Sequence, residues 1–379
     1  MRNRIFNFLE KFRRITSAES YMPEIDGLRF IAVFWVVFWM HTSNFVNVKF
    51  FNQKLFPSYI VEVILEGNHG VSLFFMISGF ILALPFARHY LLGAKKVSLK
   101  NYYVRRITRL EPPYLAALLI AFFGLVFIKK ESFIDLLPHL GASAIYCHEL
   151  IYDSNSTILG VAWSLEVEVR FYLMAPFLAY LYRIKSQGVR YLIFIILIIL
   201  FTSVGFTSLY QKLPMVISSL GWFLTGMFLC DAYVNKISLP GKKIYWYVAG
   251  MLIFVFSPFL LTLYVFFPFL LKLILLAVLF YIGITNKKMK KLLSIQWVTI
   301  LGGMCYSIYL LQFIIISGSF PLLKKIKLSN QWVGFTVYSG VIIILVLCGS
   351  MIFYRIVEQP CMRKDWYKHV FRRANKKLS

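Results

Sequence analysis

The first long apolar run of the chain, residues 27–47, decides the fold and reads GLRFIAVFWVVFWMHTSNFVN. A helix needs about 20 mostly apolar residues to span a bilayer, because its backbone polar groups must be paired within the segment. This run has that length, and Arg29 is the only Lys, Arg, Asp or Glu in it. It therefore predicts a membrane-spanning helix.

The composition places the whole chain in a bilayer. Of its 379 residues, 59% are hydrophobic and 15% are charged, whereas soluble domains are about 45–50% apolar and about 25% charged. The net charge of +25 could suggest a nucleic-acid partner, but the Lys and Arg residues punctuate long uncharged runs instead of covering a polar surface. We therefore predict a lipid-embedded protein that binds no nucleic acid.

The cysteines and histidines predict no metal centre. The five cysteines are widely spaced and form no CxxC pair, which predicts neither a disulfide framework nor a zinc site. His139 and His148 share a polar connection with Glu149 and Asp153, but their spacings match no known site geometry.

Ten runs are long and apolar enough to span a membrane. They cover residues 27–47, 70–88, 112–128, 165–182, 191–209, 214–232, 244–260, 265–284, 298–319 and 333–354. The fold predicted is therefore an all-α polytopic membrane protein with about ten transmembrane helices in a single membrane domain, residues 21–360.

The positive charges predict how the helices are oriented. One set of alternate connections, which includes both tails, holds 30 of the 41 Lys and Arg residues, and the other set holds 8. Because cytoplasmic loops carry the excess of Lys and Arg, both termini are predicted to be cytoplasmic. Residues 1–20 are predicted to form an amphipathic helix or a basic tail at that face, and residues 361–379 a basic cytosolic tail.

His41 lies in the middle of the first predicted span. It follows Arg29 by twelve residues, or roughly 18 Å at about 1.5 Å per residue of helix. An ionisable group at that depth costs about 2.5–3.5 kcal/mol on insertion scales and needs a reason. One interpretation is a histidine hydrogen-bonded between helices; the other is a neutral imidazole that acts as a general base on a hydroxyl.

Three arginines precede the third span, in the segment YYVRRITRLEPPY at residues 102–114. The positive-inside rule alone explains basic residues at this position. Arg106 and Arg109 are three residues apart and share one helical face, however, and paired guanidinium groups suit a phosphate-rich ligand. Both interpretations stay open on the residues alone.

Polar residues also gather at the start of the fourth span, in WSLEVEVRFY at residues 163–172. The structural interpretation is a helix cap by Ser164 with acidic residues in the first turn. The functional interpretation is a cavity lined by Trp163 and Glu168.

Three further polar positions are candidates for substrate contact. Ser78 and Gly79 are small residues, which favour close helix packing. Glu358, in the segment VEQP, has the simpler explanation of pairing with a nearby arginine. His69 borders the second span at the predicted outer face, where an acceptor would arrive.

Taken together, these segments resemble the acyltransferase family 3 membrane proteins, the O-acyltransferases that modify bacterial surface polysaccharides. The similarity spans the chain in six motifs: DGLR at 26–29 with His41, residues 70–80, residues 106–114, WSL at 163–165 with Glu168, YSIYL at 306–310 and VEQP at 357–360. The resemblance implies a ten-helix domain in the bacterial inner (plasma) membrane.

The resemblance also implies a reaction. An acyl group, most simply acetyl, passes from acyl-CoA on the cytosolic side to a hydroxyl of a surface glycan such as an O-antigen or capsule, with no permanently bound cofactor. Arg29, Arg106 and Arg109 would bind coenzyme A phosphates, His41 would act as general base, and Glu168 would bind the acceptor or orient the imidazole. Trp163, Ser164, Ser78, His69 and Glu358 would contact substrate.

The chain departs from the family pattern at three places. The family usually has ten residues between the basic residue and the histidine of the first helix, whereas Phe30 to Met40 make eleven. At about 100° per residue the added residue rotates His41 by about 120° from Arg29, and a π-bulge would restore the shared face. Ser72 and Gln312 stand where many members carry Asp and His.

A transporter or flippase for a glycan or lipid-linked sugar is the alternative function. Many spans, proline-broken helices and a mid-membrane histidine fit it as well, although no internal repeat is visible.

Overall fold

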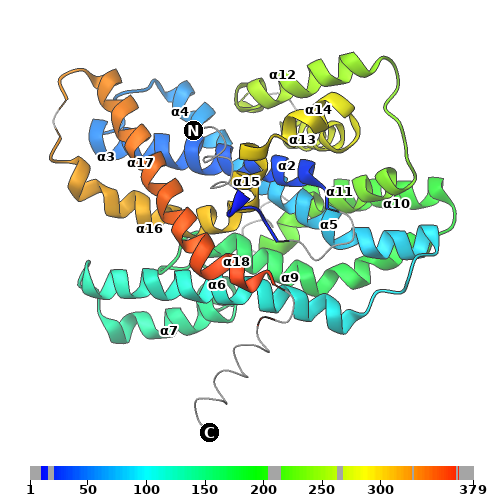
Figure 1. Ribbon diagram of the computed structural model, residues 1–379, viewed down its shortest axis with the longest axis horizontal. Coiled ribbons are helices and arrows are strands. Elements are labelled where there is room, and N and C mark those ends of the chain that lie inside the picture. Colours follow the sequence, from blue (N-terminus) through cyan, green and yellow to red (C-terminus); the bar gives the residue numbers. More distant parts are fainter. Residues whose placement is uncertain are drawn as a thin grey trace, which may run out of the picture.

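The computed structural model of the chain describes residues 10–15, 21–203, 215–262, 268–326, 328–363 and 366. The regular structure in these ranges is entirely helical, as predicted, and includes no strand (Figure 1). In chain order the elements are α2 (Pro23–Val33), η1 (Phe34–His41), α3 (Thr42–Phe51), α4 (Ser58–Leu65), η2 (Glu66–Asn68), α5 (His69–Leu92), α6 (Leu99–Phe127), α7 (Phe133–Ala144), α8 (His148–Tyr152), α9 (Ala162–Leu178), η3 (Ala179–Arg183), α10 (Gln187–Ser203), α11 (Met215–Val234), α12 (Lys243–Thr262), α13 (Pro268–Thr285), α14 (Lys287–Leu293), α15 (Gln296–Gly303), α16 (Cys305–Leu323), α17 (Gln331–Phe353), η6 (Tyr354–Glu358) and α18 (Gln359–Cys361).

Six of these helices or helix runs are long and apolar enough to cross a membrane: Pro23–Phe51, Ser58–Leu92, Leu99–Phe127, Met215–Val234, Cys305–Leu323 and Gln331–Cys361. A seventh is added if α13 and α14, bent by 91° relative to each other, count as one span. The chain is therefore a multi-pass membrane protein. A helix coincides with each of the ten apolar runs, but the count of ten crossings and the cytoplasmic placement of both termini stay predictions.

The first helix contains the wide turn that the spacing of Arg29 and His41 suggested. Residues Phe34–His41 form a π-helix, η1, between the α-helical segments α2 and α3. A π-helix closes its hydrogen bonds from residue i to i+5 and so rotates less per residue than an α-helix. The additional residue between Arg29 and His41 is thereby absorbed within one continuous 29-residue rod.

Helices α5 and α11 form the centre of the bundle. In the spans that contain them, 72% of the most apolar 18-residue stretch is buried. Their backbones touch at two glycines: a Cβ on Gly79 would lie 2.2 Å from Phe223 O, and a Cβ on Gly226 would lie 2.1 Å from Met76 O. The close-packing role predicted for Gly79 is confirmed. Helices α6 and α17 are peripheral (Figure 1). Only 33% and 28% of the most apolar stretches of their spans are buried. Their exposed apolar side chains suit contact with lipid.

A second close approach holds the first helix in place. A Cβ on Gly302 of α15 would lie 1.7 Å from Asp26 O, and a Cβ on Gly27 would lie 2.4 Å from Leu293 O. The α13–α14 bend that brings Leu293 there is capped by Asn286, whose side chain accepts hydrogen bonds from the backbone N–H groups of Lys288 and Met289. The bend therefore fixes where α2 and Arg29 sit.

Residues 10–15 belong to the segment 1–20 that was predicted to form an amphipathic helix or a basic tail. Residues 1–9 and 16–20 lie outside the described residues, but Lys11–Ile15 are not helical and dock against the end of the bundle. Phe12 is buried in the core and Arg14 forms an ion pair with the buried Asp26. The tail predicted at 361–379 is described only at residues 361–363 and 366.

Candidate active site

A cavity of about 280 Å³ opens beside the end of η1. It is lined by His41, Asn68, Val71, Asn155, Gly160, Val161, Trp163, Tyr309 and Phe313. The lining comes from four parts of the chain: η1, the η2–α5 junction, the connection from α8 to α9 with the start of α9, and α16. Pockets for small molecules are usually about 300–1,000 Å³ and mostly apolar, with a few placed polar groups. This cavity is therefore suited to a small group.

His41 is hydrogen-bonded to a residue of α16. Its Nδ1 lies 2.7 Å from Gln312 Oε1. When Gln312 accepts through its amide oxygen, Nδ1 carries the proton and Nε2 carries the lone pair. The Phe313 ring, 4.6 Å from the imidazole between centroids, packs against the same side chain. A protonated Nδ1 leaves Nε2 free to take a proton from a ligand in the cavity.

The partner of the imidazole differs from the one expected. Gln312, fully buried, occupies the orienting position for which Glu168 was proposed. Glu168 instead accepts a hydrogen bond from Ser78 Oγ, and neither residue is among those that line the cavity. The two helices that carry them, α5 and α9, pack directly on each other, which explains the pair. A catalytic role for Glu168 and substrate contact by Ser78 stay predictions.

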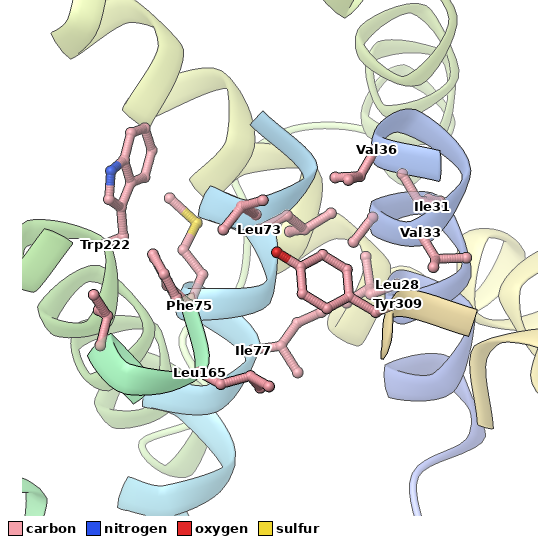
Figure 2. Packing of buried hydrophobic residues seen from close by; sticks show 14 of the residues in the cluster. Leu28, Ile31, Val33, Val36, Leu73, Phe75, Ile77, Leu165, Trp222 and Tyr309 are labelled. Atoms are coloured by element: carbon pink, nitrogen blue, oxygen red, sulfur yellow. The ribbon is translucent and has the colours of Figure 1, made fainter. Parts of the chain in front are cut away.

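Tyr309 and Ser164 form the second polar group at the cavity. The Tyr309 hydroxyl is 2.9 Å from Ser164 Oγ, and Ser164 Oγ is 3.1 Å from Val161 O. Tyr309, Gln312 and Phe313 lie at positions i, i+3 and i+4 of α16 and therefore share one helical face. Figure 2 shows the Tyr309 ring between the helices that carry Val36 and Leu73.

Trp163 lines the cavity, whereas Glu168, which was predicted to line a cavity with it, does not. The Trp163 ring packs edge-on against Phe75 with 6.3 Å between centroids. His69 does not appear in the lining, although Asn68 beside it does. The His69 Nε2 atom lies 2.6 Å from Glu66, which also accepts from Lys272 Nζ at 2.8 Å.

Arginines cluster at the opposite end of the first helix. Asp26, only 1% exposed, accepts hydrogen bonds at one carboxylate oxygen from Arg29 Nη1 at 2.6 Å and from Arg14 Nη1 at 2.7 Å. Helix α6, which carries Arg109, packs on η6, which carries Glu358. Arg29 lies about 18 Å along the helix from His41 at about 1.5 Å per residue.

Glu358 belongs to this charged cluster and not to the cavity. Its carboxylate accepts from the backbone N–H of Ser307 at 3.1 Å and from the Ser307 hydroxyl. Arg106 lies apart from Arg29: its guanidinium covers the Tyr102 ring at 4.0 Å and donates to Tyr102 O at 3.0 Å.

The histidines of the predicted outer connection bind each other. His139 Nδ1 is 2.9 Å from His148 Nε2, and Tyr152 packs on both rings. One nitrogen of each ring is therefore used in this hydrogen bond. The described residues contain no group of three potential metal ligands.

Sequence reasoning missed Tyr309, Asn68 and Asn155 as cavity residues. Tyr309 could have been identified from the sequence, because it lies in the YSIYL motif, three residues before Gln312. Asn155 lies in an irregular connection, and no periodicity predicts which way such a residue faces. Gln312 was noted as a departure from the family pattern but was not predicted to be the partner of His41.

A family model described as an acyltransferase domain matches residues 22–355. The chain therefore belongs to acyltransferase family 3. Its relatives include O-acetyltransferase OatA from Staphylococcus aureus strains NCTC 8325 / PS 47, COL and MRSA252, each 24% identical over 396 aligned positions that cover 95% of this chain. The family 3 chain spans 60% of the length of these relatives. No solved structure matches it.

Proposed function

We propose that this family 3 acyltransferase is an O-acetyltransferase of the bacterial inner (plasma) membrane that moves an acetyl group from acetyl-CoA to a hydroxyl of a surface glycan. The observation that carries the proposal is the His41–Gln312 hydrogen bond at the lining of the cavity. A general base requires a neutral imidazole with its lone pair on Nε2, and donation from Nδ1 to Gln312 Oε1 supports that form. The name of the OatA relatives supports O-acetyl transfer.

The reaction is a single transfer with His41 as base and then acid. The acceptor hydroxyl oxygen attacks the thioester carbonyl carbon while His41 Nε2 takes the hydroxyl proton. Collapse of the tetrahedral intermediate breaks the carbon–sulfur bond, and the departing thiolate takes that proton from the imidazolium. The products are an acetyl ester and free coenzyme A, and Gln312 accepts from Nδ1 throughout.

Tyr309 is the group best suited to stabilise the oxyanion. Ser164 Oγ donates its one proton to Val161 O, so Tyr309 is the donor in the hydrogen bond that the two hydroxyls share. When an oxyanion is bound, the tyrosine proton can turn to it, because Ser164 keeps Val161 O as its acceptor. Donors aimed at developing charge in a water-poor site contribute strongly to catalysis.

The two ends of the first helix suit the two substrates. Arg29 and Arg109 gather at one end, and guanidinium groups bind phosphates through paired hydrogen bonds. We assign this end, with Arg106 on the same helix as Arg109, to the coenzyme A phosphates. The thin pantetheine arm then spans the roughly 18 Å to His41 at about 1.5 Å per helical residue.

The acceptor is assigned to the outer part of the cavity. Trp163 offers an apolar ring face, and the side-chain amides of Asn68 and Asn155 offer donors and acceptors to sugar hydroxyls. A volume of about 280 Å³ favours acetyl over a long acyl chain. His69 lies one residue from Asn68 and its Nδ1 has no hydrogen-bond partner among the described residues, so contact with a larger acceptor is consistent with its position.

The test measures thiol release from acetyl-CoA by the purified protein in lipid nanodiscs, with a short N-acetylglucosamine oligosaccharide as acceptor. Acetyl ester on the acceptor is detected by mass spectrometry. We expect His41→Ala to lower the transfer rate by about 10²–10⁴-fold, the usual contribution of a general base. His89→Ala is the matched control, because His89 is bonded to Ala94 O at an exposed position.

Full transfer by His41→Ala would show that another group is the base. A wild-type protein that moves the glycan across proteoliposomes without releasing thiol would favour the transporter interpretation instead.

A further inference from the structure

The N-terminal segment Glu10–Ile15 is anchored at the arginine-rich end of the bundle. The Gln359 side-chain amide donates to Lys11 O at 2.9 Å and to Arg13 O at 3.2 Å, and Gln296 donates to Glu10 Oε1 at 3.1 Å. These contacts fix both the backbone and the direction of the segment. The segment therefore presents its next side chain, Arg14, at a defined place.

Arg14 points inward. Its side chain is 12% exposed and its Nη1 donates to Asp26 Oδ1, the same oxygen that accepts from Arg29. The absent side chain of Gly303 leaves room for it, since a Cβ there would lie 3.3 Å from the Arg14 Cβ. Arg13, the preceding residue, points outward with 60% of its side chain exposed. The two neighbouring arginines thus have different environments.

The hydrogen-bond capacity of this cluster is not used up. Asp26 already accepts from two guanidinium groups and from the Tyr21 hydroxyl at 2.9 Å. The Arg14 Nε is buried and has no hydrogen-bond partner among the described residues. Among the residues that the structure describes, no carboxylate lies within ion-pair distance of Arg109. Donors therefore remain available for a ligand.

The charges of the cluster are also unequal. Arg14, Arg29 and Arg109 carry three positive charges, and Asp26 and Glu358 carry two negative charges. Burying an uncompensated charge is costly, and a bound anion removes that cost. Several guanidinium groups from separate elements match the several oxygens of a phosphate or pyrophosphate.

We propose that Arg14 is a further donor-binding residue, which contacts a phosphate of acyl-CoA beside Arg29 and Arg109. The N-terminal segment is then part of the donor site and not only a membrane-surface tail. This proposal rests on the proposed function, because it takes acyl-CoA as the donor.

The experiment compares two donors that differ in phosphate. Acetyl-CoA carries the phosphates, and acetyl-pantetheine has the same thioester and arm without them. For Arg14→Gln we expect the KM for acetyl-CoA to rise about tenfold or more, the effect of losing one charged hydrogen bond, with kcat nearly unchanged. The rate with acetyl-pantetheine should equal that of the wild-type protein.

Two more variants separate binding from folding. Arg13→Gln is the matched control and should leave both donors unaffected. Arg14→Lys keeps a charge beside Asp26 but loses the fork, so its KM for acetyl-CoA should fall between those of the wild type and Arg14→Gln. It also gives the answer if Arg14→Gln does not fold.

Equal losses with both donors would show that Arg14 is structural, and no loss with either would show that it is dispensable. Either result overturns the proposal while acetyl transfer by the wild type still stands. A wild-type protein that leaves acetyl-CoA intact would refute the proposed function itself, and the role of Arg14 with it.

Discussion

Replacing Gln312 with leucine tests the geometry of the base most directly. The substitution keeps the approximate volume of the side chain but removes the Oε1 acceptor, 2.7 Å from His41 Nδ1. Gln312 is fully buried, so no solvent is at hand to replace the lost partner. An unpaired buried donor costs about 1–3 kcal/mol. If this cost is added to the activation free energy, the rate drops by about 5–150-fold, since about 1.4 kcal/mol is a factor of ten.

The assay is thiol release at saturating acetyl-CoA, which reports kcat, with thermal unfolding in detergent followed on the same sample. Gln312→His should retain most activity, because an imidazole nitrogen can accept from Nδ1 and many members of the family carry His there. Gln331→Leu, at an exposed position at the start of α17, controls for the loss of an amide elsewhere. A folded Gln312→Leu protein with wild-type kcat would refute the conclusion that this contact prepares His41.

Three further outcomes follow from particular contacts. Tyr309→Phe should lower kcat by about 10²–10³-fold with little change in KM, as for other single oxyanion donors; an unchanged kcat, measured by thiol release, would exclude Tyr309 from that role. Gly226→Ala should destabilise the protein by about 1–3 kcal/mol, because its new Cβ would lie 2.1 Å from Met76 O. Gly318→Ala, with open space around it, is the control, and equal unfolding temperatures for the two would contradict the close contact of α5 and α11. Arg190 and Asp231 form a buried ion pair, and Asp231→Ala should lower the free energy of unfolding by about 3–5 kcal/mol because it leaves Arg190 buried and without its carboxylate. The double variant Asp231→Leu with Arg190→Met should recover most of this stability. If it does not, the loss is due to packing.

The helical architecture was predictable because it follows from physics that acts locally. A run such as residues 191–209 must be helical in lipid whatever surrounds it, and α10 lies there. The π-helix was predictable in the same way, because the spacing of Arg29 and His41 in one helix is a local quantity. Close helix contact at Gly79 followed from its size alone.

The composition of the cavity could not be predicted in full. His41 and Trp163 were both proposed, and both line it. Their partners depend on how distant helices pack: Gln312 is 271 positions from His41, and its side chain is matched to the imidazole only after α16 has docked on η1. Arg14 was expected on a surface helix or in a basic tail, and only the fold shows that it forms an ion pair with Asp26.

The π-helix Phe34–His41 lets the first helix hold one more residue between Arg29 and His41 than family members usually have. An inserted residue normally swings everything that follows it around the axis, so that an aligned histidine would face a different neighbour. Here the widened turn confines the disturbance to eight residues. Removing one residue from this turn, for example Val36 or Val37, should restore ordinary helical winding and leave the imidazole pointing the same way. In this chain, the added residue before His41 is therefore accommodated by a change of local winding.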